Sequence, residues 1–294
     1  MQKQQFIYLF IIFSWSACHQ VTERQQPINV AYVTQTIKHI ESNLDNSNKE
    51  ENIENIQDFY YPWYTRLKSK NMLLNRISTP AGYKRINVDE DSFGNWLRHL
   101  PIKSKASKVY YYNDKPKETQ SIHEAVLDID IGNKDLQKSE DAVLRLYMEY
   151  LFSKKQFNKI TFQPSPLDTF AFLKERQKTD YLSFRKYFNE LSKLSTPYSL
   201  LENMNYAEVN NLKIGQVFVQ PDEPGHAVII VDVAENEVGQ RIFLLAQAFS
   251  PAQDIHIIKN FHHEKHLSPW YSANFGISLY TPEWEFTSSD LMEF

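Results

Sequence analysis

Residues 213–258 read KIGQVFVQPDEPGHAVIIVDVAENEVGQRIFLLAQAFSPAQDIHII and carry the strongest structural pattern of the chain. Four apolar segments rich in β-branched and aromatic residues follow one another here, with glycine or proline turns between the earlier ones. That composition and spacing predict consecutive strands of a β-meander. The predicted strands span residues 216–220, 226–234, 241–248 and 254–258.

Helical patterns dominate the sequence before this meander. Residues 135–152 predict the clearest helix, because Ala142, Leu146 and Tyr150 fall on one stripe. Residues 180–194 predict a second helix, and its apolar side is formed by Leu182, Phe184, Tyr187, Phe188 and Leu191. Helices followed by a run of meandering strands indicate the α+β class. We therefore expect helices packed on a mostly antiparallel sheet, preceded by an N-terminal extension.

Two shorter elements are predicted before the first of these helices. Residues 92–100 predict a helix that is capped by Ser92 and ended by Pro101. Residues 125–131 alternate between apolar and polar side chains, which is typical of a strand with one buried face.

The first residues of the chain have the layout of a secretory signal. Lys3 precedes an apolar run at 6–13, and small residues then lead to Cys18. The run is too short to span a bilayer, which needs about 20 residues. The sequence SAC at 16–18 resembles a bacterial lipobox, in which the cysteine sulfur is acylated, although Trp15 stands where that box usually has Leu. The alternative is an ordinary signal peptide with an incidental cysteine.

This motif divides the chain into three predicted parts. Residues 1–17 form the signal peptide, residues 18–58 a lipidated tether and linker, and residues 59–294 a single α+β domain of unknown function. Cys18 is the only cysteine, so the domain can hold neither a disulfide nor a thiol nucleophile. We expect an exported protein that is lipid-anchored to the bacterial cell envelope, at the outer membrane or the periplasmic face.

Composition excludes several classes of partner and cofactor. The 32 basic and 36 acidic residues give a net charge of −4, which offers no electrostatic footprint for nucleic acid. Glycine is scarce, at 7 of 294 residues, and no dinucleotide-binding or Walker A pattern is present. We therefore expect no nucleic acid partner, no cofactor and no metal site. The hydrophobic share of 42% suits a sizeable core.

A histidine at the start of a strand forms the first candidate site. His226 opens the predicted strand 226–234 directly after the turn at Pro224 and Gly225. This arrangement places the imidazole at a sheet edge beside a helix end, where a polar ring can reach a groove. Imidazole is the natural general base there, because its ordinary pKa lies near neutrality.

Residues 212–248 resemble the histidine motif of the NlpC/P60 and CHAP peptidoglycan amidases, with Gly225-His226 in the motif positions. The resemblance implies a papain-like fold, with His226 as the catalytic histidine and Gln247 on the next strand as the residue that orients it. The nucleophile of that family is a cysteine on the helix before the hairpin, and this chain has none. Ser183 lies on the matching helix, but a serine there would need its own base and oxyanion donors. His226 is thus an active base or a remnant of the fold.

Two carboxylates form a second candidate site. If residues 125–131 form a strand, the i, i+2 spacing puts Asp128 and Asp130 on one face, with His123 a few residues upstream. Two close carboxylates can split their pKa values for acid–base chemistry or bind a divalent cation. The alternative is a solvated strand face, or pairing with lysine and backbone groups near the helix start at Asp135.

Three further segments are interpreted as structural. Residues 262–266 read HHEKH and lack the His-Glu-x-x-His spacing of a zinc protease, because the second histidine comes one residue too soon. We interpret them as a polar loop. The aromatic motifs SPWY at 268–271 and TPEW at 281–284 can line a groove for sugar or peptide, but packing against the core is the favoured interpretation.

Five segments together resemble one uncharacterised family of bacterial lipoproteins. These segments are residues 126–137, 224–232, 245–256, 268–271 and 281–284. The resemblance covers about residues 77–294 and implies a domain of unknown function, which supports the envelope assignment but supplies no activity. By that analogy, the polar residues of these segments are the first candidates for a site.

Three functions remain open from the sequence. The leading hypothesis is a membrane-anchored domain that binds, or hydrolyses, cell-wall peptide or glycan in a groove around His226. Gln247 would orient the histidine, and Asp128 with Asp130 would form a second polar cluster. A second hypothesis is a non-enzymatic binding or assembly module that lost its nucleophile and kept the groove. A third is a glycan hydrolase that uses the two carboxylates. The missing thiol favours the binding module.

Overall fold

The computed structural model describes residues 59–64, 68–222, 224–262 and 264–294, all of which belong to one unit, Ile53–Phe294. The predicted signal peptide, the lipid attachment at Cys18 and the predicted tether lie outside the described residues. Among the helices in the described ranges, none is long and apolar enough to cross a bilayer.

A nine-stranded sheet organises this part of the chain, and every strand pair in it is antiparallel. The strand order along the sheet is β2-β9-β8-β7-β6-β13-β5, while β1 pairs with β7 and β10 with β8. The strands are β1 (Tyr83–Arg85), β2 (His123–Val126), β5 (Asn205–Tyr206), β6 (Val217–Gln220), β7 (His226–Asn236), β8 (Arg241–Gln247), β9 (His256–Ile258), β10 (Tyr271–Ser272) and β13 (Leu291–Glu293). The predicted α+β class with a mostly antiparallel sheet is confirmed.

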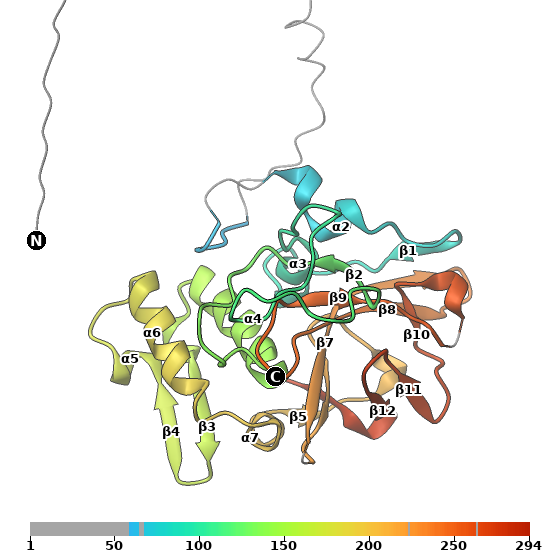
Figure 1. Ribbon diagram of the computed structural model, residues 1–294. Coiled ribbons are helices and arrows are strands. Elements are labelled where there is room, and N and C mark those ends of the chain that lie inside the picture. The colour runs from blue at the N-terminus through green and yellow to red at the C-terminus, as the bar shows by residue number, and fades with distance from the viewer. Residues whose placement is uncertain (1–58, 65–67, 223, 263) are drawn as a thin grey trace, which may run out of the picture. The chain divides into compact units, whose positions relative to one another are not determined.

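Helices and two small hairpins surround the sheet. Figure 1 shows α4 beside β7, with which it is in contact, and shows β3, β4, α5 and α6 on the other side of α4. The helices are α2 (Leu73–Arg76), α3 (Phe93–Arg98), α4 (Ser139–Ser153), α5 (Phe172–Glu175), α6 (Tyr181–Leu191) and α7 (Pro197–Glu202). The two hairpins pair β3 (Thr161–Ser165) with β4 (Asp168–Ala171) and β11 (Ser278–Tyr280) with β12 (Glu285–Thr287). Short 3-10 helices span Ser69–Asn71, Phe157–Lys159, Val209–Asn211, Lys265–Leu267 and Ser288–Asp290.

The meander β6 to β9 forms where the sequence predicts it. The turn between β6 and β7 requires glycine at residue 225, because a Cβ there would lie 2.6 Å from the Asp222 carbonyl oxygen and 2.8 Å from that of Gln220. No real Cβ approaches backbone atoms so closely. The tight turn places His226 opposite Gln220 at the first register position of the β6–β7 pair.

Both faces of the sheet are covered by apolar side chains. Along β7, Ala227, Ile229 and Val231 belong to the core cluster that contains α4 and α6. Val228 and Ile230 belong to a second cluster on the opposite face. This alternation follows from the two-residue period of a strand. The wholly apolar segment 227–231 is therefore explained by burial on both faces.

A buried carboxylate ties the first elements of the domain to β7. Asp232 is fully buried and accepts hydrogen bonds from Arg85 on β1 (2.5 Å) and Arg98 on α3 (2.7 Å). The pairing of β7 with β8 has a register shift between Ile230 and Asp232. An irregularity of this kind redirects a side chain, and that of Asp232 meets Arg85 and Arg98. The two guanidinium groups supply the opposite charge that a buried carboxylate needs.

Three predicted elements differ from the structure. The helix predicted at 135–152 begins at Ser139, because Lys138 before it is extended and Asp141 in the first turn accepts the backbone N–H of Lys138. The strand predicted at 125–131 is instead β2, which ends at Val126 because its partner β9 begins at His256. In the second helix, Leu182 is 65% exposed and does not belong to the apolar side.

Candidate functional site

Polar side chains from distant parts of the chain form one continuous hydrogen-bonded network. Its members come from the segments at 126–137, 224–232, 245–256 and 281–284, joined by residues of α4 and α6. Most of these side chains are buried, and buried polar groups require hydrogen-bond partners. The network therefore places the polar residues of four conspicuous segments in one region.

The inner end of the network contains the predicted histidine. His226 is only 1% exposed, and its Nε2 lies 3.0 Å from Oε1 of Gln247 on the neighbouring strand β8. The Gln247 amide in turn donates to Glu283 (2.7 Å), whose carboxylate pairs with the Lys117 ammonium at 2.6 Å. The structure thus brings the two predicted residues together and adds an ion pair that the sequence does not predict.

The environment of His226 keeps its imidazole neutral. Burial lowers the pKa of His226 to about 4, and the hydrogen bond to Gln247 offsets this only in part. The rings of Phe249, Trp284 and Phe286 surround the imidazole at centroid distances of 4.6 to 6.0 Å. The expected position at a sheet edge facing a groove is therefore wrong, because β7 lies between β6 and β8 and aromatic rings cover its first residue.

A second buried histidine adjoins the inner end. His256 on β9 lies 3.4 Å from the Gln247 amide nitrogen through its Nε2, and its Nδ1 lies 2.8 Å from the Asp254 carbonyl oxygen. Burial lowers the pKa of His256 to about 3. Burial therefore favours the neutral form of both imidazoles.

Amide side chains carry the network from the inner end toward α4. Lys117 donates to Gln253 Oε1 at 3.0 Å, and the backbone carbonyl of Gln253 accepts from Gln137 at 3.3 Å. Gln137 then accepts a hydrogen bond from Arg145 at 2.7 Å. Gln137 and Gln253 are both about 98% buried, so these contacts supply the hydrogen-bond partners that their polar groups need.

Arg145 is the hub of the outer end. Its fully buried guanidinium donates to Asp130 at 2.9 Å and to Glu149 at 3.3 Å, while Tyr181 donates to Glu149 at 2.8 Å. A second guanidinium, that of Arg185 on α6, lies 3.3 Å from Asp130. Partial burial acts to raise the pKa of Asp130, but the two guanidinium groups outweigh it and hold that pKa below its ordinary value.

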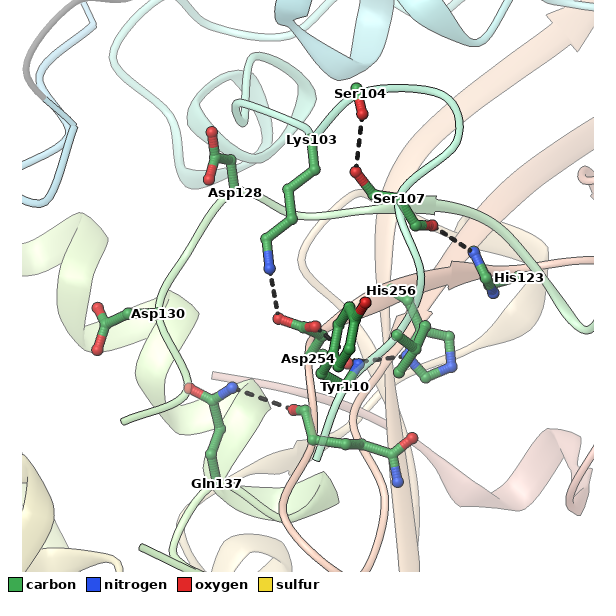
Figure 2. A network of polar contacts seen from close by, with 12 residues as sticks. Lys103, Ser104, Ser107, Tyr110, His123, Asp128, Asp130, Gln137, Asp254 and His256 are labelled. Atoms are coloured by element: carbon green, nitrogen blue, oxygen red, sulfur yellow. Dashed lines mark hydrogen bonds and ion pairs between the residues drawn. The ribbon is translucent and has the colours of Figure 1, made fainter. Parts of the chain in front are cut away.

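Figure 2 shows the part of the network near the two predicted aspartates, and no interaction joins their carboxylates. Lys103 extends toward Asp254 and donates to its Oδ1 at 2.8 Å, and the backbone N–H of Tyr110 donates to the other oxygen at 2.9 Å. Burial raises the pKa of Asp254 in spite of the Lys103 ammonium. The arrangement expected for Asp128 and Asp130, a pair on one strand face, is not formed, because the strand ends before them and Arg145 holds Asp130.

An open pocket of about 310 Å³ adjoins the outer end of the network. Its lining residues are Trp63, Tyr64, Lys103, Asp128, Ile129 and Asp130. The indole N–H of Trp63 donates to the backbone carbonyl of Asp128 at 2.7 Å, which fixes the ring beside the aspartate. Within the described residues, the Asp128 carboxylate itself makes no hydrogen bond or ion pair. The pocket thus combines two aromatic residues with a carboxylate that has no partner among the described residues.

The other predicted residues lie elsewhere. Ser183 is in the first turn of α6, where its backbone N–H donates to the cap residue Asp180, and within the described residues no contact joins it to His226. Of residues 262–266, which were expected to form a polar loop, residue 263 lies outside the described residues, and Lys265 and His266 instead begin a short 3-10 helix. Trp270 is 1% exposed and donates to the Ser78 carbonyl, which agrees with packing rather than ligand binding. No group of three or more potential metal-ligating side chains gathers in the described ranges.

The sequence did not indicate seven residues of this region, namely Trp63, Lys103, Lys117, Tyr181, Arg185, Arg145 and Glu149. One signal in the sequence points to the last two. Arg145 and Glu149 are four residues apart on the helix predicted at 135–152, among apolar residues, so their charges fall within a buried face. Buried charges of this kind must be paired, and they mark a polar network in the core.

Comparisons with known proteins add one family match. A family described as "Domain of unknown function (4846)" matches residues 73–173 and 168–293. No curated protein and no solved structure matches the chain. The matched segments contain every member of the polar network described above except those of the pocket wall before residue 73.

Proposed function

We propose, for a chain that belongs to the family described as "Domain of unknown function (4846)", that the folded domain is a binding module of the bacterial cell envelope. Its ligand is a peptide or glycan fragment of the cell wall. The family description supplies no activity.

The pocket beside Trp63 is the observation that carries the proposal. It is open, has a volume of about 310 Å³, and combines aromatic walls with polar groups held in place by neighbours. Aromatic faces with a few fixed polar groups are the usual composition of a small-ligand site. Asp130 and Lys103 are oriented by Arg145 and Asp254, so these two groups are organised before a ligand arrives.

The contacts of His226 favour binding over hydrolysis as the function. The resemblance of the hairpin to NlpC/P60 and CHAP amidases suggests a common ancestry, and the contact of His226 with Gln247 is consistent with it. An amidase of that kind needs a nucleophile within hydrogen-bond reach of the histidine. In the described part of the chain, the contacts of His226 are an amide and three aromatic rings. The histidine thus supports the fold around the network, and the pocket binds the ligand.

We further propose that Cys18 is acylated and anchors the protein to the cell envelope. The support is the short apolar run at 6–13 followed by SAC at 16–18. Metabolic labelling with a fatty-acid probe should mark the wild type and leave the Cys18→Ser variant unmarked. Equal labelling of the two proteins would refute the lipid anchor and would leave the proposed binding function unaffected.

Co-sedimentation with purified peptidoglycan sacculi tests the binding function. The full chain, purified in detergent, is compared with Asp128→Asn and with a matched control, Asp168→Asn, which makes the same change on an exposed carboxylate of β4. We expect the wild type and the control to sediment with sacculi, and Asp128→Asn to remain largely in solution. No sedimentation of the wild type, or equal sedimentation of all three proteins, would contradict the proposal. Soluble sugar or peptide released by the wild type would instead reveal hydrolysis.

A further inference from the structure

We infer that the pocket beside Trp63 recognises an ammonium group, so that its ligand is an amine-bearing peptide of the cell wall rather than a neutral glycan. The inference rests on the proposed function, which it deepens by naming the chemical class of the ligand.

Within the described residues, every charged side chain of the pocket except Asp128 has a counter-charge. Lys103 is paired with Asp254 at 2.8 Å, and Asp130 is paired with both Arg145 and Arg185. Asp128, which has no partner among the described residues, adds one negative charge to a balanced set. A ligand that places a positive charge beside Asp128 completes the balance. A sugar hydroxyl can donate to the carboxylate but cannot neutralise it.

The aromatic walls favour the same kind of ligand. Trp63 and Tyr64 line the pocket together with Asp128, and a cation is attracted to the face of an aromatic ring. Trp63 cannot use its indole N–H to bind a ligand, because that group already donates to the Asp128 carbonyl oxygen. Contacts of Trp63 with Tyr61 and Trp96, at centroid distances of 5.3 and 5.9 Å, hold its ring in position. What this residue offers to a ligand is its ring surface.

An organic cation fits this pocket better than a metal ion does. Calcium takes six to eight oxygen ligands, and magnesium demands an octahedral set. Asp128 is a lone free carboxylate, because the oxygens of Asp130 are occupied by two guanidinium groups. A single carboxylate with aromatic neighbours suits an ammonium group, which brings its own hydrogen-bond donors.

Lys103 indicates what lies next to the ammonium group of the ligand. An ammonium has three donors, and Asp254 accepts from only one of those of Lys103, whose side chain is 31% exposed. The remaining donors are available to a carbonyl or carboxylate of the ligand. The pocket thus offers the Asp128 carboxylate as an acceptor and the Lys103 ammonium as a donor. A peptide that carries both an amine and carbonyl groups can use both.

Paired peptides that differ in one acetyl group test the inference. The probe is a stem peptide with an acetylated N-terminus and a free lysine side-chain amine, and its twin carries an acetyl group on that amine as well. Binding of each to the full chain is measured by calorimetry, beside a neutral trimer of N-acetylglucosamine. We expect the free amine to bind at least about tenfold more tightly than its twin, a factor that corresponds to about 1.4 kcal/mol.

Variants connect this preference to the pocket. Asp128→Asn should lose the preference for the free amine, whereas Asp168→Asn should keep it in full, with unchanged melting temperatures in both. Equal affinity of the two peptides for the wild type, or a preference that survives in Asp128→Asn, would overturn the inference. Binding of the sugar trimer alone would leave the proposed envelope function standing and refute the amine. If neither the peptides, the trimer nor sacculi bind, the proposed function itself fails.

Discussion

The burial of the His226 imidazole makes the free energy of unfolding depend on pH. Burial lowers its pKa from 6.5 to about 4. Between these two values the unfolded chain binds a proton that the folded chain does not bind. Stability due to this group is therefore fully present above pH 6.5 and is lost as the pH falls toward 4. The perturbation is a change from pH 7.5 to pH 5, made on the wild type and on His226→Gln.

The size of the effect follows from the two pKa values. At pH 5 an unfolded histidine with a pKa of 6.5 is stabilised by protonation by about 2 kcal/mol, and the folded one gains almost nothing. Glutamine can still donate to Gln247 and carries no titratable group. Acidification should therefore reduce the free energy of unfolding of the wild type by about 2 kcal/mol more than that of His226→Gln. The remaining titratable groups, His256 among them, are common to both proteins and cancel in the difference.

Urea unfolding at the two pH values measures this difference by linear extrapolation. An equal pH dependence of the two proteins would refute the reasoning, because His226 would then titrate alike in the folded and unfolded chains. If the variant does not fold, an NMR titration of the imidazole in the wild type decides the matter. A midpoint near 4 is expected, and one near 6.5 would contradict the enclosed position.

Three further changes test the packing that positions the network. Asp232→Asn should cost about 3 kcal/mol of unfolding free energy in urea, because Arg98 and Arg85 lose their common counter-charge; a loss below 1 kcal/mol would argue against that pairing. Gly225→Ala should lower the free energy of unfolding by about 1–3 kcal/mol, since its Cβ meets backbone atoms of the turn, and an unchanged melting temperature would contradict this. Tyr181→Phe should cost about 1–3 kcal/mol at pH 7 by removing a donor from the buried carboxylate of Glu149, and an equally stable variant would show that the bond contributes nothing.

The strands of the meander could be predicted because their signals are local. Alternating or wholly apolar runs bounded by glycine and proline located β6, β7 and β8 within one or two residues of their observed bounds. The strands β10 and β13 carried no such signal, because they are two or three residues long and form only where β8 and β6 provide a partner. Short strands of this kind depend on tertiary contacts, which the sequence pattern does not contain.

The candidate site could be predicted only where neighbouring strands build it. His226 and Gln247 meet because they lie on adjacent strands of one meander. The contacts of Glu283 with Gln247 and Lys117 join residues 36 and 166 positions apart, and no periodicity reports such distances. The sequence singles out Asp128, but its open surroundings depend on the end of β2 and on Trp63, which lies 65 residues away.

The indole N–H signal of Trp63 in a proton–nitrogen NMR titration tests the binding account most directly, because that group donates to the backbone of Asp128 at the pocket wall. The signal is assigned with Trp63→Phe, and soluble cell-wall peptide is added to the full chain. The account predicts that the Trp63 signal shifts with saturation, while that of Trp284, beside His226, stays in place. A saturable shift of the Trp284 signal with an unchanged Trp63 signal would contradict the account and would place the binding site beside His226.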